Sequence, residues 1–307
     1  MKKLLMCVAL FAVATLSAQA QLLYKISGKN IKKPSYVVGT YHVAPHTFVD
    51  SIPGLKDVYG EVKQVYGEVV TSEMTKQENV MKMMQMMMLP QGESLYTIYN
   101  EKEINEIDSV VQQIMGISMR NPMVEKQLIQ LTPQTLSTQL TALMAMKMNP
   151  GLDISKPIDM QLQNMAIEKG LKVGGLETID SQMKILYGVP MEKGKKNLLC
   201  FVRNIEDGKA QSQHLQLAYM SRDIKGIEAA MEKKMNNECD PSEEDMNILL
   251  YNRNNAWIEI MPEIMESPTL FAVGAGHLVG ERGILALLTK AGYKVEPIDV
   301  ISKSCCK

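Results

Sequence analysis

The sequence lacks the short motifs by which several large enzyme classes are identified. It contains no Gly-x-Ser-x-Gly nucleophile turn, no phosphate-binding P-loop, no Cys-x-x-Cys pair and no His-Glu-x-x-His pair. The last absence excludes a standard zinc peptidase of the His-Glu-x-x-His type. None of these motifs therefore identifies a catalytic site in this chain.

An excess of charge of one sign is also missing. The chain has 33 Lys and Arg residues against 34 Asp and Glu residues, and the two signs are interspersed. Because nucleic-acid-binding proteins usually carry a basic stripe or patch, this balance argues against a nucleic-acid partner. Beyond the first 20 residues, no apolar run is long enough to cross a membrane.

The first 20 residues have the pattern of a secretory leader. Met1-Lys2-Lys3 is basic, 4–16 is apolar, and Ser17-Ala-Gln-Ala20 ends in the small-residue pattern of a cleavage site. We predict cleavage after Ala20 and a periplasmic or secreted protein. The remaining chain of roughly 290 residues is long enough to bury a large core.

Cysteine is scarce, and four cysteines remain after this processing: Cys200, Cys239, Cys305 and Cys306. An even number in an oxidising compartment permits disulfides, and Cys200–Cys239 is one candidate pair. Cys305 and Cys306 lie in a short tail, 301–307. For this tail we expect no structure, in preference to a metal-binding or redox role.

Histidine is scarcer than the length suggests, with four in the chain, yet two of them occupy matching places. Each follows a short apolar, strand-like run through a Gly-x-x-His turn: Gly39-Thr-Tyr-His42 and Gly274-Ala-Gly-His277. Each turn is followed by a loop, an expected helix and an expected strand, at 55–64 and 65–70 after the first turn and at 284–291 and 293–298 after the second. The repeat predicts two related half-units whose histidines converge on one site.

The remaining patterns complete an α/β fold. Strands are expected at 22–27 and 171–177 as well, with a helical insertion at about 75–170 and further helices at about 180–265. We therefore predict a central mixed sheet built from two pseudo-symmetric strand–GxxH–helix–strand halves with a long helical insertion. Residues 21–300 form one domain in this interpretation.

The two repeated histidines are candidate metal ligands. Turns at the carboxyl ends of strands are where open α/β sheets bind their ligands. Imidazole binds Zn, Mn, Fe or Co, with carboxylates completing the shell. For His42 or His277 alone, a core or capping role would be the better interpretation, and the repeat reverses that preference. His46 and His214 lie outside the repeat and are assigned no role.

Two glutamates stand in apolar, strand-like sequence. A buried carboxylate is costly unless it is paired or bound to a cation, so Glu68 and Glu177 are candidates for the same site. The alternatives are that Glu68 is exposed on an edge strand and that Glu177 caps a helix that begins near Thr178.

Arg253 lies on the apolar face of the last long helix, which begins at Ser242 with Asp245 three residues later, a capping-box spacing. On that face Arg253 needs an anion, which can be one of the two glutamates, a substrate carboxylate or a developing oxyanion. The alternative is that its stem lies on the apolar face while the charge reaches solvent. The expected inward face consists of Met246, Leu249, Leu250, Arg253, Trp257, Ile260 and Ile264.

Methionine is abundant, with 25 residues, many of them in 80–89. Thioethers bind Cu(I), and Met-rich surfaces bind varied partners. The interpretation we favour for this segment is an apolar helix whose core uses methionine.

Taken together, the motifs resemble those of the TraB/GumN family, which includes the Tiki metalloproteases and belongs to a wider group with the erythromycin-esterase-like and ChaN-like proteins. The resemblance extends from Leu22 to Ile298. It rests on Gly39-Thr-Tyr-His42, Glu68, Gly175-Leu-Glu-Thr178 with Gln182, Arg253-Asn254-x-x-Trp257 and Gly274-Ala-Gly-His277. It implies an α/β fold with a cleft lined by both GxxH turns and, for the Tiki branch, metal-dependent peptide hydrolysis.

Two functions follow as expectations. The first is a hydrolase of peptides or small molecules that holds a divalent metal (Mn, Co or Zn) with His42, His277 and Glu68. In it Glu177 or Glu68 is the general base, Glu177 being the preferred choice, and Arg253 stabilises an oxyanion. The second is a protein that binds haem, iron or a peptide in the same cleft without turnover, as ChaN-like relatives do with haem or iron.

Overall fold

The computed structural model describes residues 21–149, 151–235 and 239–298. The expected leader and the Cys305–Cys306 tail lie outside these ranges. Within them, no helix is both long and apolar enough to span a membrane. The expected Cys200–Cys239 disulfide is present.

The core of the fold is a six-stranded mixed sheet. Across the sheet the strands are β4 (Lys172–Gly175), β3 (Gln64–Gly67), β5 (Thr269–Gly274), β2 (Ser35–Thr40), β1 (Leu23–Ser27) and β6 (Lys294–Pro297). The four strands from β4 to β2 are parallel, while β1 is antiparallel to both of its neighbours. The predicted α/β fold class is confirmed.

The two GxxH strands are direct neighbours, because β2 pairs in parallel with β5. In this pair Thr40, and not Gly39, lies opposite Gly274. The two GxxH turns are therefore offset by one residue along the paired strands. Gly39 is needed where the two turns meet, since a Cβ there would lie 2.9 Å from the Leu278 side chain and 3.0 Å from that of Ala275. The convergence of the two half-units therefore begins in the sheet itself.

Helices cover both faces of the sheet. The connection from β2 to β3 passes over β5, whereas the connection from β5 to β6 runs the other way past β2 and β1. Because such crossovers are right-handed, their helices fall on opposite faces. One face carries α1 (Leu55–Glu61), α7 (Ile158–Glu168), α10 (Ile205–Met220), α11 (Ile224–Glu232) and the 3₁₀ turn η1 (His46–Ser51). The other carries α13 (Asn252–Ile264) and α14 (Ile284–Lys290).

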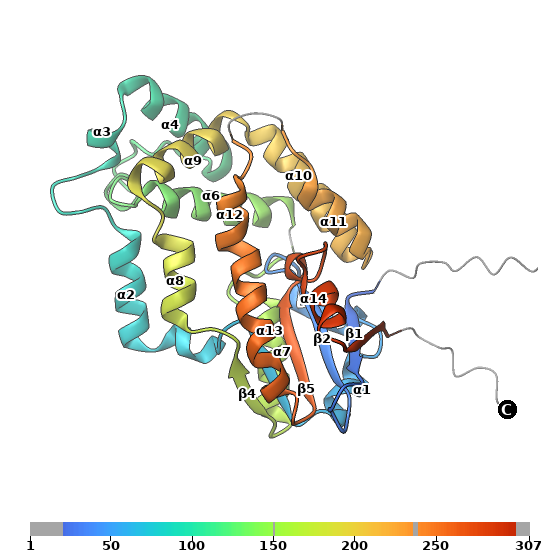
Figure 1. The fold of residues 1–307 in the computed structure, drawn as a ribbon. Coiled ribbons are helices and arrows are strands. Elements are labelled where there is room, and N and C mark those ends of the chain that lie inside the picture. Colours follow the sequence, from blue (N-terminus) through green and yellow to red (C-terminus); the bar gives the residue numbers. More distant parts are fainter. Residues whose placement is uncertain (1–20, 150, 236–238, 299–307) are drawn as a thin grey trace, which may run out of the picture.

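A second apolar core lies among the helices outside the sheet layers. It is formed by α4, α6 and α9 with their connecting segments, and Figure 1 shows α3, α4 and α9 gathered at one end of the molecule, away from β4 and β5. The helices of this region are α2 (Gln77–Met87), α3 (Leu95–Ile98), α4 (Glu101–Met115), α5 (Glu125–Leu128), α6 (Pro133–Met148), α8 (Ile179–Tyr187) and α9 (Met191–Arg203), preceded by the 3₁₀ turn η2 (Thr71–Thr75).

The last long helix is less regular than the sequence suggests. It begins with α12 (Glu243–Met246), for which Ser242 and Asp245 form the expected capping box, and continues through a π-helix, η3 (Asn247–Tyr251), into α13. The wider π-turn changes the helical phase, so the expected inward face is wrong in part. Leu249 and Ile260 are exposed, by 43% and 39%, and the buried face of α13 consists of Asn254, Trp257 and Met261.

Candidate active site

The carboxyl ends of the parallel strands bring the predicted site residues together. Glu68 directly follows β3, and Glu177 lies just beyond β4, where its backbone N–H donates to the Glu68 carbonyl at 2.8 Å. His42 follows β2, and His277 ends the 3₁₀ turn η4 (Ala275–His277) that follows β5. This is the edge of the sheet at which open α/β proteins bind ligands.

Arg253 occupies the centre of this group, and its side chain is 12% exposed. Its Nη2 donates to Glu68 at 2.5 Å and to Glu177 at 2.6 Å, and its Nε donates to Glu177 at 3.1 Å. Its Nη1 donates to the Leu249 carbonyl and to Nε2 of His277, both at 3.0 Å. All five guanidinium N–H groups therefore have acceptors. Of the anions considered for Arg253, it contacts both glutamates, and the solvent-facing alternative is wrong.

His277 is a buried, neutral imidazole with a defined tautomer. It is 4% exposed, and burial lowers its pKa to about 4 despite the attraction of Glu68. The Asn254 amide nitrogen donates to the carbonyls of His277 and Arg282, so the Asn254 oxygen faces the ring and accepts from Nδ1 at 2.7 Å. Nδ1 therefore carries the proton, and the Nε2 lone pair points at Arg253.

Glu68 is ionised although it is 7% exposed. Burial alone raises its pKa, but positive charge around the carboxylate outweighs that effect and lowers the pKa to about 2. That charge comes first from His277, which is protonated at such low pH, and then from Arg253 and His42, while the Gly274 N–H donates to Glu68 Oε1 at 2.8 Å. The edge-strand alternative is wrong, because β3 lies between β4 and β5.

Gln182 bridges the carboxylates of Glu68 and Glu177. Gln182 on α8 donates to Glu68 at 3.3 Å and to Glu177 at 3.4 Å. The capping alternative for Glu177 is also wrong, because the side chain that caps α8 is Thr178, which accepts from the Ser181 N–H. Gln182 had no predicted role, although it is one of the motif residues on which the family resemblance rests.

His42 has a different environment from its counterpart. Its side chain is 65% exposed, and Nδ1 lies 2.7 Å from a carboxylate oxygen of Asp159. The other oxygen of Asp159 accepts from the Thr40 hydroxyl at 2.6 Å. The Asp159 charge, together with its hydrogen bond to the ring, raises the pKa of His42 to about 9. The repeated turns thus present one buried neutral imidazole and one exposed imidazolium.

Asp159, in the first turn of α7, had no predicted role, so its effect on His42 can be tested directly. Asp159→Asn is expected to lower the pKa of His42 from about 9 towards the usual value near ~6.5. The sign follows from the raised pKa: the ion pair stabilises the fold at low pH and is lost as the pH rises through the His42 pKa. NMR titration of the imidazole protons of the metal-free protein measures this.

The matched reference in that titration is exposed His214, whose resonances are expected to be the same in both proteins. A parent His42 that already titrates near ~6.5 would show that the Asp159 contact is absent in solution.

The aromatic wall of the site is Trp257, the one tryptophan of the chain, which is 1% exposed. Its ring centroid lies 4.6 Å from that of His277, and the Arg253 guanidinium carbon lies 4.7 Å from the Trp257 ring. The indole therefore excludes water from one side of the ion cluster and interacts with the cation through its π-face.

The chemistry of the donor atoms fits a divalent cation. Nε2 of His277 and Oε1 of Glu68 are 3.7 Å apart, and two atoms bound to one metal at about 2.1 Å lie roughly 3 Å apart. Two carboxylates against one guanidinium also leave a net negative charge. Among the described residues, however, no three His, Cys, Asp or Glu side chains already surround a common metal position. The Arg253 N–H on Nε2 and a metal on Nε2 exclude each other.

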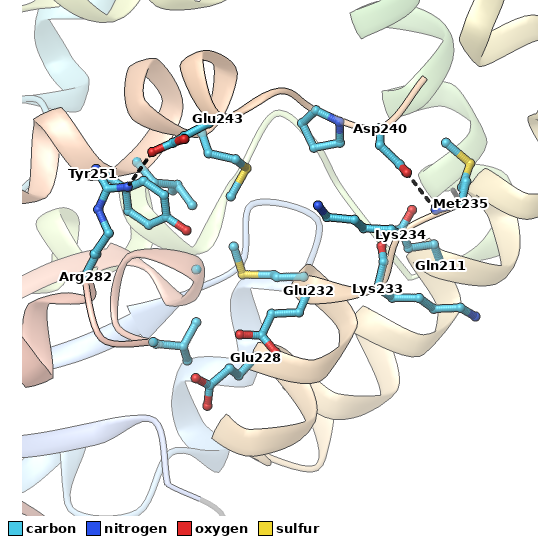
Figure 2. Close-up of a pocket in the computed structure, with 17 residues that line it drawn as sticks. Gln211, Glu228, Glu232, Lys233, Lys234, Met235, Asp240, Glu243, Tyr251 and Arg282 are labelled. Atoms are coloured by element: carbon cyan, nitrogen blue, oxygen red, sulfur yellow. Dashed lines mark hydrogen bonds and ion pairs between the residues drawn. The ribbon is translucent and has the colours of Figure 1, made fainter. Parts of the chain in front are cut away.

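A cavity of about 450 Å³ lies behind the second GxxH turn. Gly276 lines it beside His277, and Leu250 and Tyr251 line it from the π-helix that leads to Arg253. Figure 2 shows Glu228 and Glu232 of α11 on one side and Tyr251, stacked with Arg282, on another. The cavity thus adjoins the segments that carry His277 and Arg253, although neither of these two side chains lines it.

The fold and these residues define a doubly wound α/β protein with a His–Glu–Arg cluster at the carboxyl edge of its sheet. A sequence profile described as the TraB/PrgY/gumN family matches residues 22–297, and the chain belongs to that family. No curated protein and no solved structure matched the chain in the corresponding comparisons.

Proposed function

We propose that this protein is an exported hydrolase, with peptides as the preferred substrate class, that uses a divalent cation at the cluster around Arg253. One observation carries the proposal: Nε2 of neutral His277 lies 3.7 Å from Oε1 of the ionised Glu68 carboxylate, in a cluster with surplus negative charge. The Cys200–Cys239 disulfide supports export, because disulfides persist in oxidising compartments.

In this proposal His277 and Glu68 hold the cation (Mn, Co or Zn), whose contribution would be to lower the pKa of a bound water. Asn254 holds His277 in the tautomer that leaves Nε2 unprotonated, as partners of metal-binding histidines do. Once Nη1 leaves His277, Arg253 has an N–H for a developing oxyanion while Glu177 still fixes the other side of the guanidinium.

Glu177 is our candidate general base, because the donors to its carboxylate are the side chains of Arg253 and Gln182. The carboxylate of Glu68, in contrast, also accepts from a backbone N–H. His42 was expected to be a third metal ligand. Because His42 is protonated and held by Asp159, it can donate a proton to a leaving amine. We propose this role for His42 in place of the third metal ligand, with His277 and Glu68 holding the cation.

The test loads the metal-free mature protein, expected to begin at Gln21, with Mn, Co or Zn and assays a peptide library and ester substrates. Glu177→Gln is expected to keep the metal and lower kcat by about 10²–10⁴-fold, the usual contribution of a general base. Exposed Glu259→Gln on α13 is the matched control and is expected to have parental activity. Glu68→Gln is expected to lose metal affinity, which would separate the ligand from the base.

The competing function is a carrier of haem, iron or a peptide. The observation that favours a carrier is the cavity of Figure 2, whose lining includes the thioethers of Met231 and Met246 and the aromatic ring of Tyr251. Absence of turnover with every metal, together with tight haem or iron binding, would decide for the carrier and against the hydrolase.

A further inference from the structure

The methionines of α2 lie on the surface and not in a core. None of the residues of α2 is buried, and the side chains of Met81 and Met84 are 62% and 60% exposed. Met88, which follows the helix, is 42% exposed. The interpretation of this segment as an apolar helix with a methionine core is therefore wrong.

Two of the exposed thioethers lie next to each other on α2, because positions 81 and 84 have the three-residue spacing that places Cβ atoms about 5–6 Å apart on a helix. The third, Met88, is the extended residue that caps the C-terminal end of the helix. The orientation of α2 is fixed from its other side, where the helix packs against α8 and Lys82 pairs with Asp180 at 3.2 Å. The half-buried methionines are Met83, Met86 and Met87.

Packing does not explain why this outer face carries sulfur. Leucine has similar volume and equal helix propensity, so an apolar face alone needs no thioether. Thioether sulfur is distinguished from an alkyl chain by its preference for soft cations, and Cu(I) is the soft cation that methionine binds in proteins. No group of three His, Cys, Asp or Glu among the described residues offers a competing site of harder donors.

We propose that the outer face of α2 binds one Cu(I) ion through Met81, Met84 and Met88. This site is separate from the Arg253 cluster and does not require the hydrolase function. Two elements join α2 to the cluster: α8 contacts α2 and carries Gln182, and η2, which follows Glu68 in the chain, also contacts α2.

The test titrates the mature protein with Cu(I) in oxygen-free buffer against the chromogenic Cu(I) chelator bicinchoninate. One equivalent is expected to bind, and X-ray absorption is expected to show sulfur ligands. The triple substitution Met81→Leu, Met84→Leu and Met88→Leu keeps the apolar volume and helix propensity, and is expected to weaken Cu(I) binding at least about tenfold, because the soft ligands are removed.

Met123→Leu is the matched control. Met123 is 82% exposed and lies outside α2 in the chain, so its substitution is expected to leave Cu(I) affinity unchanged. Equal affinity of the triple variant and the parent, or no uptake of Cu(I) by the parent, would overturn the proposal. So would a triple variant that changes self-association while keeping its Cu(I) affinity, because α2 would then be a docking face.

Discussion

Replacing Arg253 with alanine is expected to lower the free energy of unfolding by about 3–5 kcal/mol and to abolish hydrolysis. Removing one partner of a buried ion cluster leaves the other charges without compensation, which is the costly case for buried ion pairs. Here the carboxylates of Glu68 and Glu177, whose side chains are 8% and 9% exposed, would lose their shared cation. Urea unfolding of the metal-free proteins measures the change.

Two variants make this result specific. Arg203→Ala removes an exposed pair with Glu106 and is expected to cost no more than about 1 kcal/mol. Adding Glu177→Gln to Arg253→Ala removes one of the orphaned charges and is expected to restore part of the stability. An Arg253→Ala protein as stable as the parent would contradict the network, and one that retains activity would remove Arg253 from the proposed mechanism.

Trp257→Ala is expected to have a comparable effect on stability through a different cause. Truncating a fully buried large aromatic leaves a cavity, which typically costs about 3–5 kcal/mol. The cavity would open beside the His277 ring and the Arg253 guanidinium, so we also expect His277 to become easier to protonate. Unfolding followed by circular dichroism gives the stability, and NMR titration of His277 gives the pKa.

Ile260→Ala on the same helix is the control for that substitution. Ile260 is 39% exposed, so its truncation is expected to cost less than about 1 kcal/mol. Trp257→Phe keeps most of the volume and is expected to lie between the parent and the alanine variant. Equal stability of Trp257→Ala and Ile260→Ala would show that the indole is not part of the core.

The local patterns of the sequence predict the sheet end of the site well. Glycine turns after apolar runs identify β2 and β5, and apolar context identifies Glu68 and Glu177 as buried. The position of Arg253 on a helix face predicts its inward direction. These features depend on spacing within one element, and spacing is visible in a single sequence.

The rest of the site depends on contacts between distant segments. Asp159 is 117 residues from His42 and determines why this histidine is charged while His277 is neutral. The repeat suggests equal roles for the two histidines, and their neighbours make them different. The π-helix Asn247–Tyr251 likewise has no signal in a pattern of apolar residues, and it moved Leu249 out of the predicted buried face.

The place of β5 in the sheet has a consequence for how the chain is made. This strand lies between β3 and β2, yet it comes at Thr269–Gly274, near the end of synthesis. Strands made early therefore have no central partner while the ribosome is still translating the helical segments. The sheet and the Arg253 cluster close together, late, by contacts between the two ends of the chain. The pairs β1–β2 and β3–β4 can form earlier, but they are joined only through β5, and such non-local pairing folds slowly.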